Sequence, residues 1–275
     1  MKQLDLKKFG PWAVVTGASS GIGEEFARQL AANDFNLVLV ARRLPLLNAL
    51  AEELEQLHSI NVRVAVVDLT EASLLEPLIE VTKDIEIGLL VSNAGTGHPG
   101  DFLSMPYETL ASSVDLNVRS HLQLVHYYGR LMAQRGKGGI LLVSAMGASE
   151  GLPYMANDAA TKAYIISLGE GLNVEFAKHG VNVSVLLPGP TETPILDKFG
   201  FDAAAMPVKP MPVAQCVAEG LAALQRNKAS HLSGRLNRMM SVIVPVGMRR
   251  RLLGNMIAQG ARKQQPKQPV AELNI

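Results

Sequence analysis

Short runs of apolar, often β-branched residues alternate along the chain with longer segments whose apolar residues recur every three or four positions. The short runs are apolar on both faces, which is typical of parallel strands covered by helices on each side. They occupy residues 12–16, 36–41, 62–67, 87–92, 139–144 and 181–187. The helical segments lie at about 22–33, 43–58, 71–83, 107–135 and 155–178. This alternation predicts right-handed βαβ units and an α/β fold with a doubly wound parallel sheet.

The pattern changes near residue 230. From Arg226 onward ten basic residues stand against one acidic residue, Glu272. We therefore expect a single domain over residues 1–230 and a basic, partly helical extension over 231–275 with a disordered end. The extension could pack over a ligand pocket, close a dimer or lie on a membrane surface. A solvated helix with an apolar face toward the core is commoner than membrane contact, so membrane contact is the less favoured of these alternatives.

Composition narrows the class of protein. The 275 residues, 48% of them hydrophobic, suffice for one large domain, and a net charge of +1 argues against nucleic acid as the main partner. No apolar run reaches the roughly 18 residues of a membrane-spanning helix, and the N-terminus does not resemble a secretory signal. The single cysteine, Cys216, fits a buried apolar position in a reducing compartment. We expect a cytoplasmic protein without a metal site, in which His121 and His126 are packing or surface residues.

A glycine-rich stretch, TGASSGIG at residues 16–23, follows the first strand and opens the first helix. Gly17, Gly21 and Gly23 allow a tight turn and close approach of a ligand, and the positive end of the helix dipole favours a pyrophosphate. The spacing is G-x-x-x-G-x-G rather than the commoner G-x-G-x-x-G, and no P-loop Gly-Lys-Ser/Thr follows. An ordinary turn before a helix is the alternative, but the position after the first strand favours a dinucleotide site.

The end of the second strand indicates which dinucleotide binds. An acidic residue there hydrogen-bonds the ribose of NAD, whereas arginine accommodates the 2′-phosphate of NADP. In this chain Ala41 stands where the acid would be, and Arg42 and Arg43 follow it. We therefore predict NADP(H) as the cofactor. The alternative is that both arginines are ordinary solvated residues at the start of a helix.

Further motifs follow in one order over residues 10–225. They are DLT at 68–70, NAG at 93–95, Asn117 in VDLNV, Ser144 in VSAMG, ATKAY around Lys162 and PGPTETP at 188–194. Together with TGASSGIG they resemble the short-chain dehydrogenases/reductases. The resemblance implies one Rossmann-type domain of about seven parallel strands and a nicotinamide cofactor. It also implies a homodimer or homotetramer formed through the helices at 107–135 and 155–178.

The resemblance assigns cofactor contacts to several loops. Asp68 would bond the adenine edge beside Leu69, and residues 93–95 would shape the floor under the adenine ribose. Ordinary turn chemistry is the alternative for the loop residues. With the glycines and arginines above, the implied cofactor-binding residues are Ser19, Ser20, Ile22, Asp68, Leu69, Asn93, Ala94, Gly95, Lys162, Pro188, Gly189, Thr191 and Thr193.

Enzymes of this family use a serine that orients the substrate oxygen and a tyrosine that acts on it as general acid or base. A lysine binds the nicotinamide ribose and lowers the tyrosine pKa, and an asparagine holds a water. The match gives Ser144, Lys162 and Asn117 for three of these roles. The tyrosine position, four residues before the lysine, is occupied by Asp158.

Aspartate is poorly suited to replace that tyrosine. Its carboxyl group has a reference pKa near 4, and we expect the lysine one turn away to favour the charged form further. A carboxylate has no proton to give, is shorter than a phenol and opposes the negative charge of a developing alkoxide. The catalytic set would thus be Asn117, Ser144, Asp158 and Lys162, with impaired reduction.

The sequence therefore predicts an NADP(H)-dependent oxidoreductase that interconverts a carbonyl and an alcohol. The Met, Phe and Pro content of residues 195–212, which we expect to form a lid, suggests a small lipophilic substrate. The alternative is a non-catalytic NADP(H)-binding sensor or scaffold of the same fold.

Overall fold

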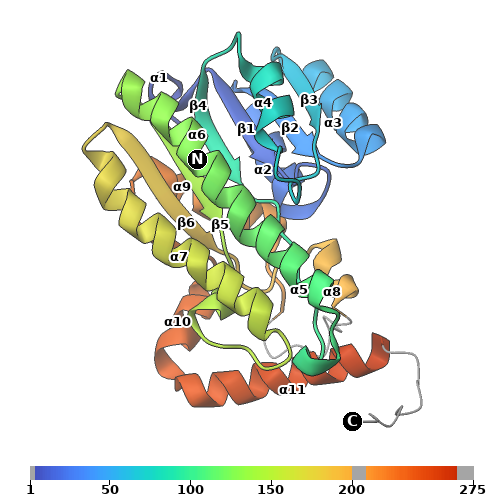
Figure 1. Ribbon diagram of the computed structural model, residues 1–275. Coiled ribbons are helices and arrows are strands. Elements are labelled where there is room, and N and C mark those ends of the chain that lie inside the picture. Colours follow the sequence, from blue (N-terminus) through green and yellow to red (C-terminus); the bar gives the residue numbers. More distant parts are fainter. Residues whose placement is uncertain (1–3, 200–208, 265–275) are drawn as a thin grey trace.

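The computed structural model describes residues 4–199 and 209–264 of the chain. Seven parallel strands form one sheet in the order β3-β2-β1-β4-β5-β6-β7 (Figure 1). The strands are β1 (Trp12–Thr16), β2 (Asn36–Ala41), β3 (Val62–Val66), β4 (Ile87–Ser92), β5 (Gly138–Val143), β6 (Val181–Leu187) and β7 (Ser230–Leu232). The α/β fold predicted from the apolar runs is confirmed.

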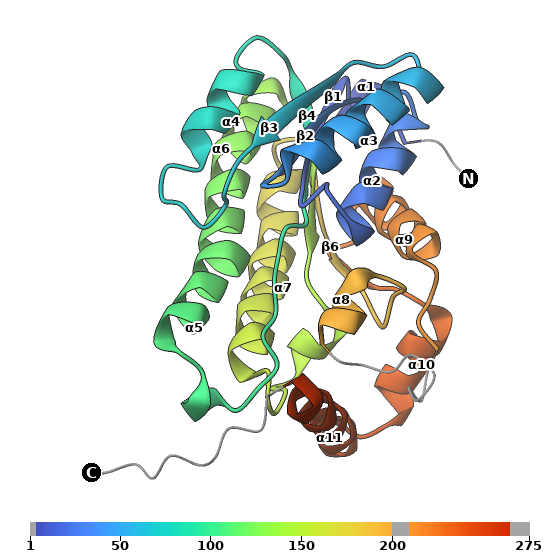
Figure 2. The ribbon, with the colours of Figure 1, turned by 90° about the vertical axis from the view of Figure 1, so that its right-hand side faces the viewer.

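Helices cover both faces of the sheet (Figure 2). One layer contains α2 (Gly21–Ala31), α3 (Leu44–Leu57) and α9 (Val213–Gln225). The other contains α4 (Leu75–Thr82), α5 (Tyr107–Val114), α6 (Ser120–Arg135) and α7 (Ala156–Ala177). The remaining helices are α1 (Leu6–Phe9), α8 (Pro194–Lys198), α10 (Arg235–Ile243) and α11 (Val246–Gln264).

Two apolar cores lie between the layers, one on each face of the sheet. Phe26 of α2, Leu47 of α3 and Leu224 of α9 are fully buried in the first. Leu78 of α4 and Tyr128 of α6 are fully buried in the second. Because alternate residues of each strand point to opposite faces, the strands need apolar side chains on both, as their composition indicated.

The sheet has a topological switch point between β1 and β4. The chain runs from β1 through β2 to β3 on one side, then crosses back to β4 and continues outward on the other. In such sheets a crevice opens at the carboxyl ends of the strands where the order reverses. The Thr16 hydroxyl at the end of β1 accepts bonds from the backbone N–H groups of Asn93 and Ala94, at 2.9 and 3.0 Å, and so joins the loops on either side.

Three details differ from the predicted elements. Helix α4 begins at Leu75 rather than near residue 71, because Asp68 accepts bonds from the backbone N–H and hydroxyl of Thr70 and holds a turn there. The helix predicted over 107–135 contains a π-helical turn, Asp115–Arg119, between α5 and α6. Strand β7 had no predicted counterpart among the apolar runs.

The C-terminal helices α10 and α11 lie across the end of the molecule where the strands have their carboxyl termini (Figure 1). Short 3-10 turns, η1 (Phe102–Ser104) and η3 (Met146–Ser149), lie in loops after β4 and β5. None of the helices in the described part of the chain is long and apolar enough to cross a membrane.

Candidate active site

A cavity of about 660 Å³ lies at the carboxyl edge of the sheet, over the switch point. It brings together most of the residues singled out in the sequence. Of the residues singled out in the sequence, those that line it are Gly17, Ser19, Ser20, Gly21, Ile22, Arg42, Arg43, Asp68, Leu69, Asn93, Ala94, Gly95, Ser144, Asp158, Lys162, Pro188, Gly189, Thr191 and Thr193. Gly23 and Asn117 are not among the lining residues.

The glycine-rich turn is shaped for an anionic ligand. Gly17 and Gly21 have φ angles of 67° and 59°, which side chains other than hydrogen rarely permit. A Cβ on Gly23 would lie 2.2 Å from the Gly17 carbonyl oxygen. Only glycine at position 23 therefore lets the first turn of α2 pack this closely against the loop. Ser20, the N-cap of α2, makes no capping bond through its side chain in the described structure. The N–H groups at the start of α2 therefore face the cavity without a side-chain cap from Ser20, which fits a phosphate.

Two guanidinium groups flank this turn at the end of β2. The Arg43 guanidinium donates to the hydroxyls of Ser19 and Ser20, at 2.8 and 2.9 Å. Arg42 lies 3.7 Å from the carboxylate of Asp68 and is largely exposed. Both positive charges thus lie beside the cavity in a position suited to an additional phosphate.

The loop after β4 brings the turn and the catalytic positions together. The Asn93 side chain donates to the Thr16 carbonyl oxygen at 2.9 Å, which fixes the loop against β1. A Cβ on Gly95 would lie 2.7 Å from Lys162 Nζ, so the glycine leaves the space that the ammonium group occupies.

Lys162 reaches the cavity from α7. Its Nζ donates to the carbonyl oxygen of Val143, at 3.2 Å. Burial lowers the pKa of Lys162 to about 8, although Asp158 acts in the opposite direction. The Ser144 hydroxyl lies in the same cavity and donates to the Lys162 carbonyl oxygen at 2.7 Å.

Asp158 occupies the first turn of α7 and is only 6% exposed. One carboxylate oxygen accepts a hydrogen bond from the backbone N–H of His98, at 2.8 Å. The other is buried and has no hydrogen-bond partner among the described residues. Burial raises the pKa of Asp158, and this effect outweighs the His98 N–H and the positive charge of Lys162. The charge of Lys162 does lower the pKa of Asp158, as expected from the sequence, but burial, which the sequence did not reveal, raises that pKa by more.

Asn117 lies on the π-helical turn behind the cavity wall and is fully buried. Its side chain accepts from the Thr96 backbone N–H at 2.9 Å, and donates to the Thr96 carbonyl oxygen and the Thr161 hydroxyl, each at 3.0 Å. In this arrangement it ties the loop after β4 to α7. The extra residue of a π turn, a feature frequent at functional sites, gives Asn117 this position.

The end of the cavity beyond Asp158 is apolar. Leu152 and Met155 line it from the segment before α7, and Leu253, Met256 and Ile257 line it from α11. Sequence analysis left the role of the extension open, although the spacing of the last three residues is that of one helix face. An ion pair between Arg249 and the buried Glu150 also holds α11 beside η3. Of the expected lid, α8 contributes Ile195 and Leu196 to the cavity, whereas residues 200–208 lie outside the described part of the chain.

The remaining candidate residues lie elsewhere. The two tyrosines nearest to Lys162 in the sequence do not replace the missing phenol: Tyr154 precedes α7 in a turn with a φ of 63°, Tyr164 is partly exposed, and neither is among the cavity residues. His121 is buried, with its ring nitrogens 2.8 Å from Ser92 Oγ and 2.9 Å from the Ala94 carbonyl oxygen, and burial lowers its pKa to about 3. His126 is exposed, and Cys216 is buried as expected.

Comparison with known proteins identifies this arrangement. A model of the short chain dehydrogenase family matches residues 11–203. The 7beta-hydroxysteroid dehydrogenase of Clostridium sardiniense is 31% identical over 233 residues, which are 84% of this chain and 88% of that protein. The inactive hydroxysteroid dehydrogenase-like protein 1 of Rattus norvegicus is 31% identical over 186 residues, 66% of this chain and 56% of the relative.

A solved structure gives the same result. A short-chain dehydrogenase from Sphingobium yanoikuyae in complex with NADPH superimposes with a TM-score of 0.76 at 28% sequence identity, over 96% of this chain and 99% of the other. The region matched by the family model, residues 11–203, includes the glycine-rich turn, Ser144, Asp158 and Lys162. The chain belongs to the short-chain dehydrogenase family.

Proposed function

We propose that this chain is an NADP(H)-dependent oxidoreductase of the carbonyl and alcohol class, acting on a small lipophilic substrate, with reduction impaired by Asp158. One observation carries the proposal. A single cavity is lined at one end by the glycine-rich turn with Arg42 and Arg43, and at the other by apolar side chains, with Asp158 and Lys162 between them.

Several features support NADP(H) as the cofactor. The open N-terminus of α2 suits a pyrophosphate, and the two arginines at the end of β2 suit a 2′-phosphate. The relative that contains NADPH has the same fold. The apolar end of the cavity supports a lipophilic substrate, as does the similarity to a hydroxysteroid dehydrogenase.

Each residue of the site would have its own role in the reaction. When bound, NADP(H) exchanges a hydride with the carbon atom of the substrate. The Lys162 ammonium would hold the nicotinamide ribose, and the Ser144 hydroxyl would turn from the Lys162 carbonyl oxygen to the substrate oxygen. Asn117 would keep Thr96 and Thr161 in place beneath both. The apolar walls would exclude water.

The step that these residues do not supply is proton transfer to the substrate oxygen. In the ionised form Asp158 has no proton, and its negative charge disfavours an alkoxide nearby. Its raised pKa increases the neutral fraction at a given pH. The short side chain is nevertheless held by His98 rather than extended toward the substrate.

A second candidate is a non-catalytic NADP(H)-binding sensor or scaffold. It is favoured by Asp158 itself, and by the 31% identity to a relative whose name describes it as inactive. Both candidate functions include binding of NADP(H). They differ only in whether a hydride is then transferred to or from a substrate.

The test has two stages. Titration with NADPH and NADH comes first, with millimolar binding of NADPH as the minimum requirement. Turnover of lipophilic ketones is then compared between the wild type, Asp158→Tyr and Asp158→Asn. We expect Asp158→Tyr to gain at least about a hundredfold, the range of one general acid, and Asp158→Asn to gain little. If NADPH binds but Asp158→Tyr brings no turnover, the sensor or scaffold is the correct function.

A further inference from the structure

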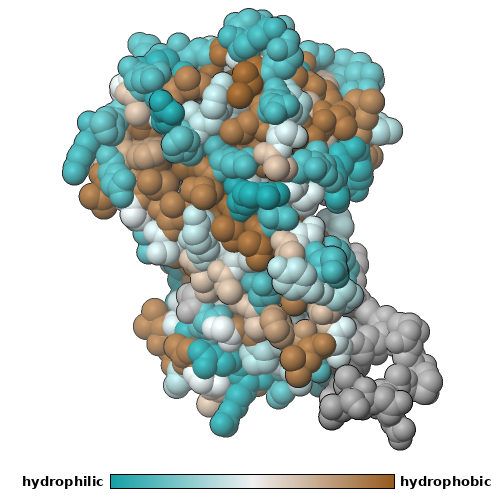
Figure 3. Space-filling model, viewed as in Figure 1, coloured by the Kyte–Doolittle hydropathy of each residue, from teal (hydrophilic) through white to brown (hydrophobic). Residues whose placement is uncertain are grey.

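Helices α10 and α11 present a group of apolar side chains to solvent. Val242 is 85% exposed and Ile243 is 67% exposed. We call the group the C-terminal patch and define it as Leu236, Met239, Val242, Ile243, Met248 and Leu252. Figure 3 shows apolar residues on the surface at this end of the molecule. Exposed apolar side chains gathered at one end of a molecule indicate an interaction site.

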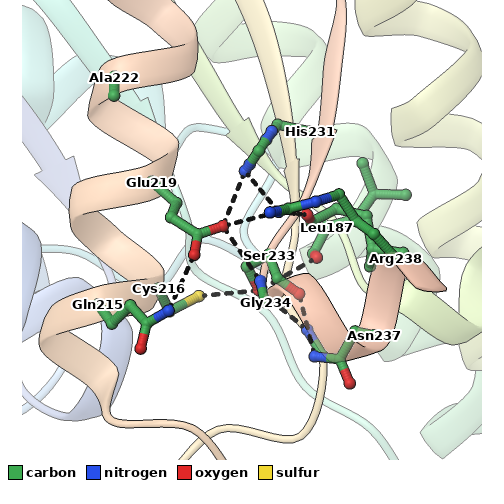
Figure 4. A network of polar contacts seen from close by, with 12 residues as sticks. Leu187, Gln215, Cys216, Glu219, Ala222, His231, Ser233, Gly234, Asn237 and Arg238 are labelled. Carbon is green, nitrogen blue, oxygen red and sulfur yellow. Dashed lines mark hydrogen bonds and ion pairs between the residues drawn. The ribbon is translucent and has the colours of Figure 1, made fainter. Parts of the chain in front are cut away.

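Helix α10 is inverted relative to an ordinary surface helix. Arg235 is exposed, but the polar residues Asn237 and Arg238 point inward: Asn237 is buried and donates to the Ser233 carbonyl oxygen at 3.0 Å. Arg238 donates to the Glu219 carboxylate and to the Leu232 carbonyl oxygen, at 2.9 and 2.8 Å (Figure 4). The apolar side chains are left to face outward. The sequence-based expectation of an apolar face toward the core is therefore wrong for α10.

The inverted orientation is fixed by a network around Glu219 of α9. One oxygen of its carboxylate accepts from His231 at 2.9 Å, from the Gly234 backbone N–H at 3.1 Å and from Arg238 (Figure 4). Although burial acts to raise it, bonds from His231, Gln215, Gly234 and Arg238 lower the pKa of Glu219 to about 2. The carboxylate therefore stays charged at neutral pH and holds α10 with its apolar face outward.

The charges around the patch indicate which kind of partner it would bind. Arg235, Arg250 and Arg251 are exposed beside the apolar residues. The sequence contains no acidic residue between Glu219 and Glu272. Apolar side chains with positive charges beside them match a membrane surface with anionic headgroups, where the apolar groups enter the boundary and the arginines meet phosphates. We propose that the C-terminal patch docks this protein on the surface of an anionic membrane.

A second copy of the chain fits the patch less well. A two-fold contact places the same surface on both subunits, so the arginines of one copy would oppose those of the other without acidic partners. Helix α11 gives a further reason for a lipid partner. Its outward residues Met248 and Leu252 belong to the patch, while Leu253, Met256 and Ile257 line the cavity. Docking would bring the apolar end of the cavity next to the lipid.

The test is flotation of the full-length protein with phosphatidylcholine vesicles, with and without phosphatidylglycerol. Patch variants are Val242→Ser with Ile243→Ser, and Arg250→Gln with Arg251→Gln. Matched controls lie on other helices than the C-terminal pair and the expected oligomer interface: Leu57→Ser on α3, at 66% exposure, and Lys7→Gln on α1. All substitutions are at exposed positions outside the cavity, and the circular dichroism spectrum and thermal unfolding of each variant show that it is folded.

We expect recovery with the anionic vesicles alone, and loss of recovery as salt rises toward about 0.5 M. Removing the two arginines should weaken binding about fivefold for each, and removing Val242 and Ile243 roughly tenfold or more. The control variants should float like the wild type. The proposal is overturned if the wild type does not float at low salt, or if patch and control variants behave alike. It is also overturned if the patch variants change the sedimentation mass but not flotation, because a second copy would then be the partner. NADPH titration is independent of all these results.

Discussion

Asp158 and Lys162 lie one turn apart on α7, yet each is held by a different segment of the chain. Asp158 takes a hydrogen bond from the His98 backbone N–H at 2.8 Å, and Lys162 gives one to the Val143 carbonyl oxygen at 3.2 Å. Burial is the largest effect on both, raising the pKa of Asp158 and lowering that of Lys162 to about 8. Each side chain is thus shifted toward its neutral form, which makes the charge of the site depend on pH.

Replacing Asp158 by asparagine should reveal the cost of burying the carboxylate. A carboxyl group whose pKa is raised on folding contributes stability at low pH, and this contribution is lost as pH rises through the folded pKa. Asp158→Asn should therefore gain stability relative to the wild type as the pH rises from about 4 to about 7. Urea unfolding at both values measures this. If the stability gain of Asp158→Asn over the wild type is the same at both pH values, or is larger at pH 4, the raised pKa is contradicted.

Lys162→Met should show the opposite trend. The folded pKa of about 8 lies below the reference value of 10.5, so the unfolded chain binds more protons between these values. The wild type therefore becomes more stable relative to Lys162→Met as pH rises, by about 2 kcal/mol at most between about pH 7.5 and 10. Unfolding free energies of both proteins at the two pH values test this. Lys178→Met, at an exposed position, is the control for the loss of a lysine as such.

Arg42 and Arg43 should determine the preference between the two dinucleotides. Removing a charge-assisted bond to the 2′-phosphate costs about 1.5–3 kcal/mol, so Arg43→Ala is expected to weaken NADPH binding about ten- to hundredfold. NADH binding should change much less, because it lacks that phosphate. Fluorescence titration gives both dissociation constants. Equal losses for NADPH and NADH would mean that Arg43 acts only by holding Ser19 and Ser20 in place.

Two glycine substitutions should have opposite effects on stability. At Gly17 the φ is 67°, and a Cβ would lie 2.9 Å from Asn93 Nδ2, so Gly17→Ala should cost about 1–3 kcal/mol and weaken NADPH binding. At Gly171, in α7, a Cβ would meet nothing within 4 Å, and Gly171→Ala should stabilise by about 0.5–1 kcal/mol. Thermal unfolding with and without NADPH separates the two. Stabilisation by Gly17→Ala would show that the turn is not held in this conformation.

The sequence predicted the central fold because each buried strand is a local apolar run bounded by turns. Six strands could be found in this way. Strand β7 could not, because its three residues, Ser230–Leu232, are only half buried and form the edge of the sheet beside β6. The orientation of α10 could not be predicted from the sequence either, because it depends on Glu219, a residue of another helix.

The candidate site was also predictable from the sequence only in part. The glycine-rich turn, Arg42 and Arg43 lie at strand ends, so their convergence follows from the parallel topology alone. The state of Asp158 does not, because its burial depends on the loop that carries His98, far away in the sequence. The Arg249–Glu150 pair likewise required the path of α11 to be known.

Gly189 and Asn237 are far apart in the sequence but pack directly against each other. A Cβ on Gly189 would lie 2.1 Å from Asn237 Nδ2, so the loop after β6 has no room for a side chain while α10 is in place. The two segments must therefore be exchanged together. A chimaera that joined residues 1–230 to the tail of another short-chain dehydrogenase would need residues 188–194 from the same parent as the tail.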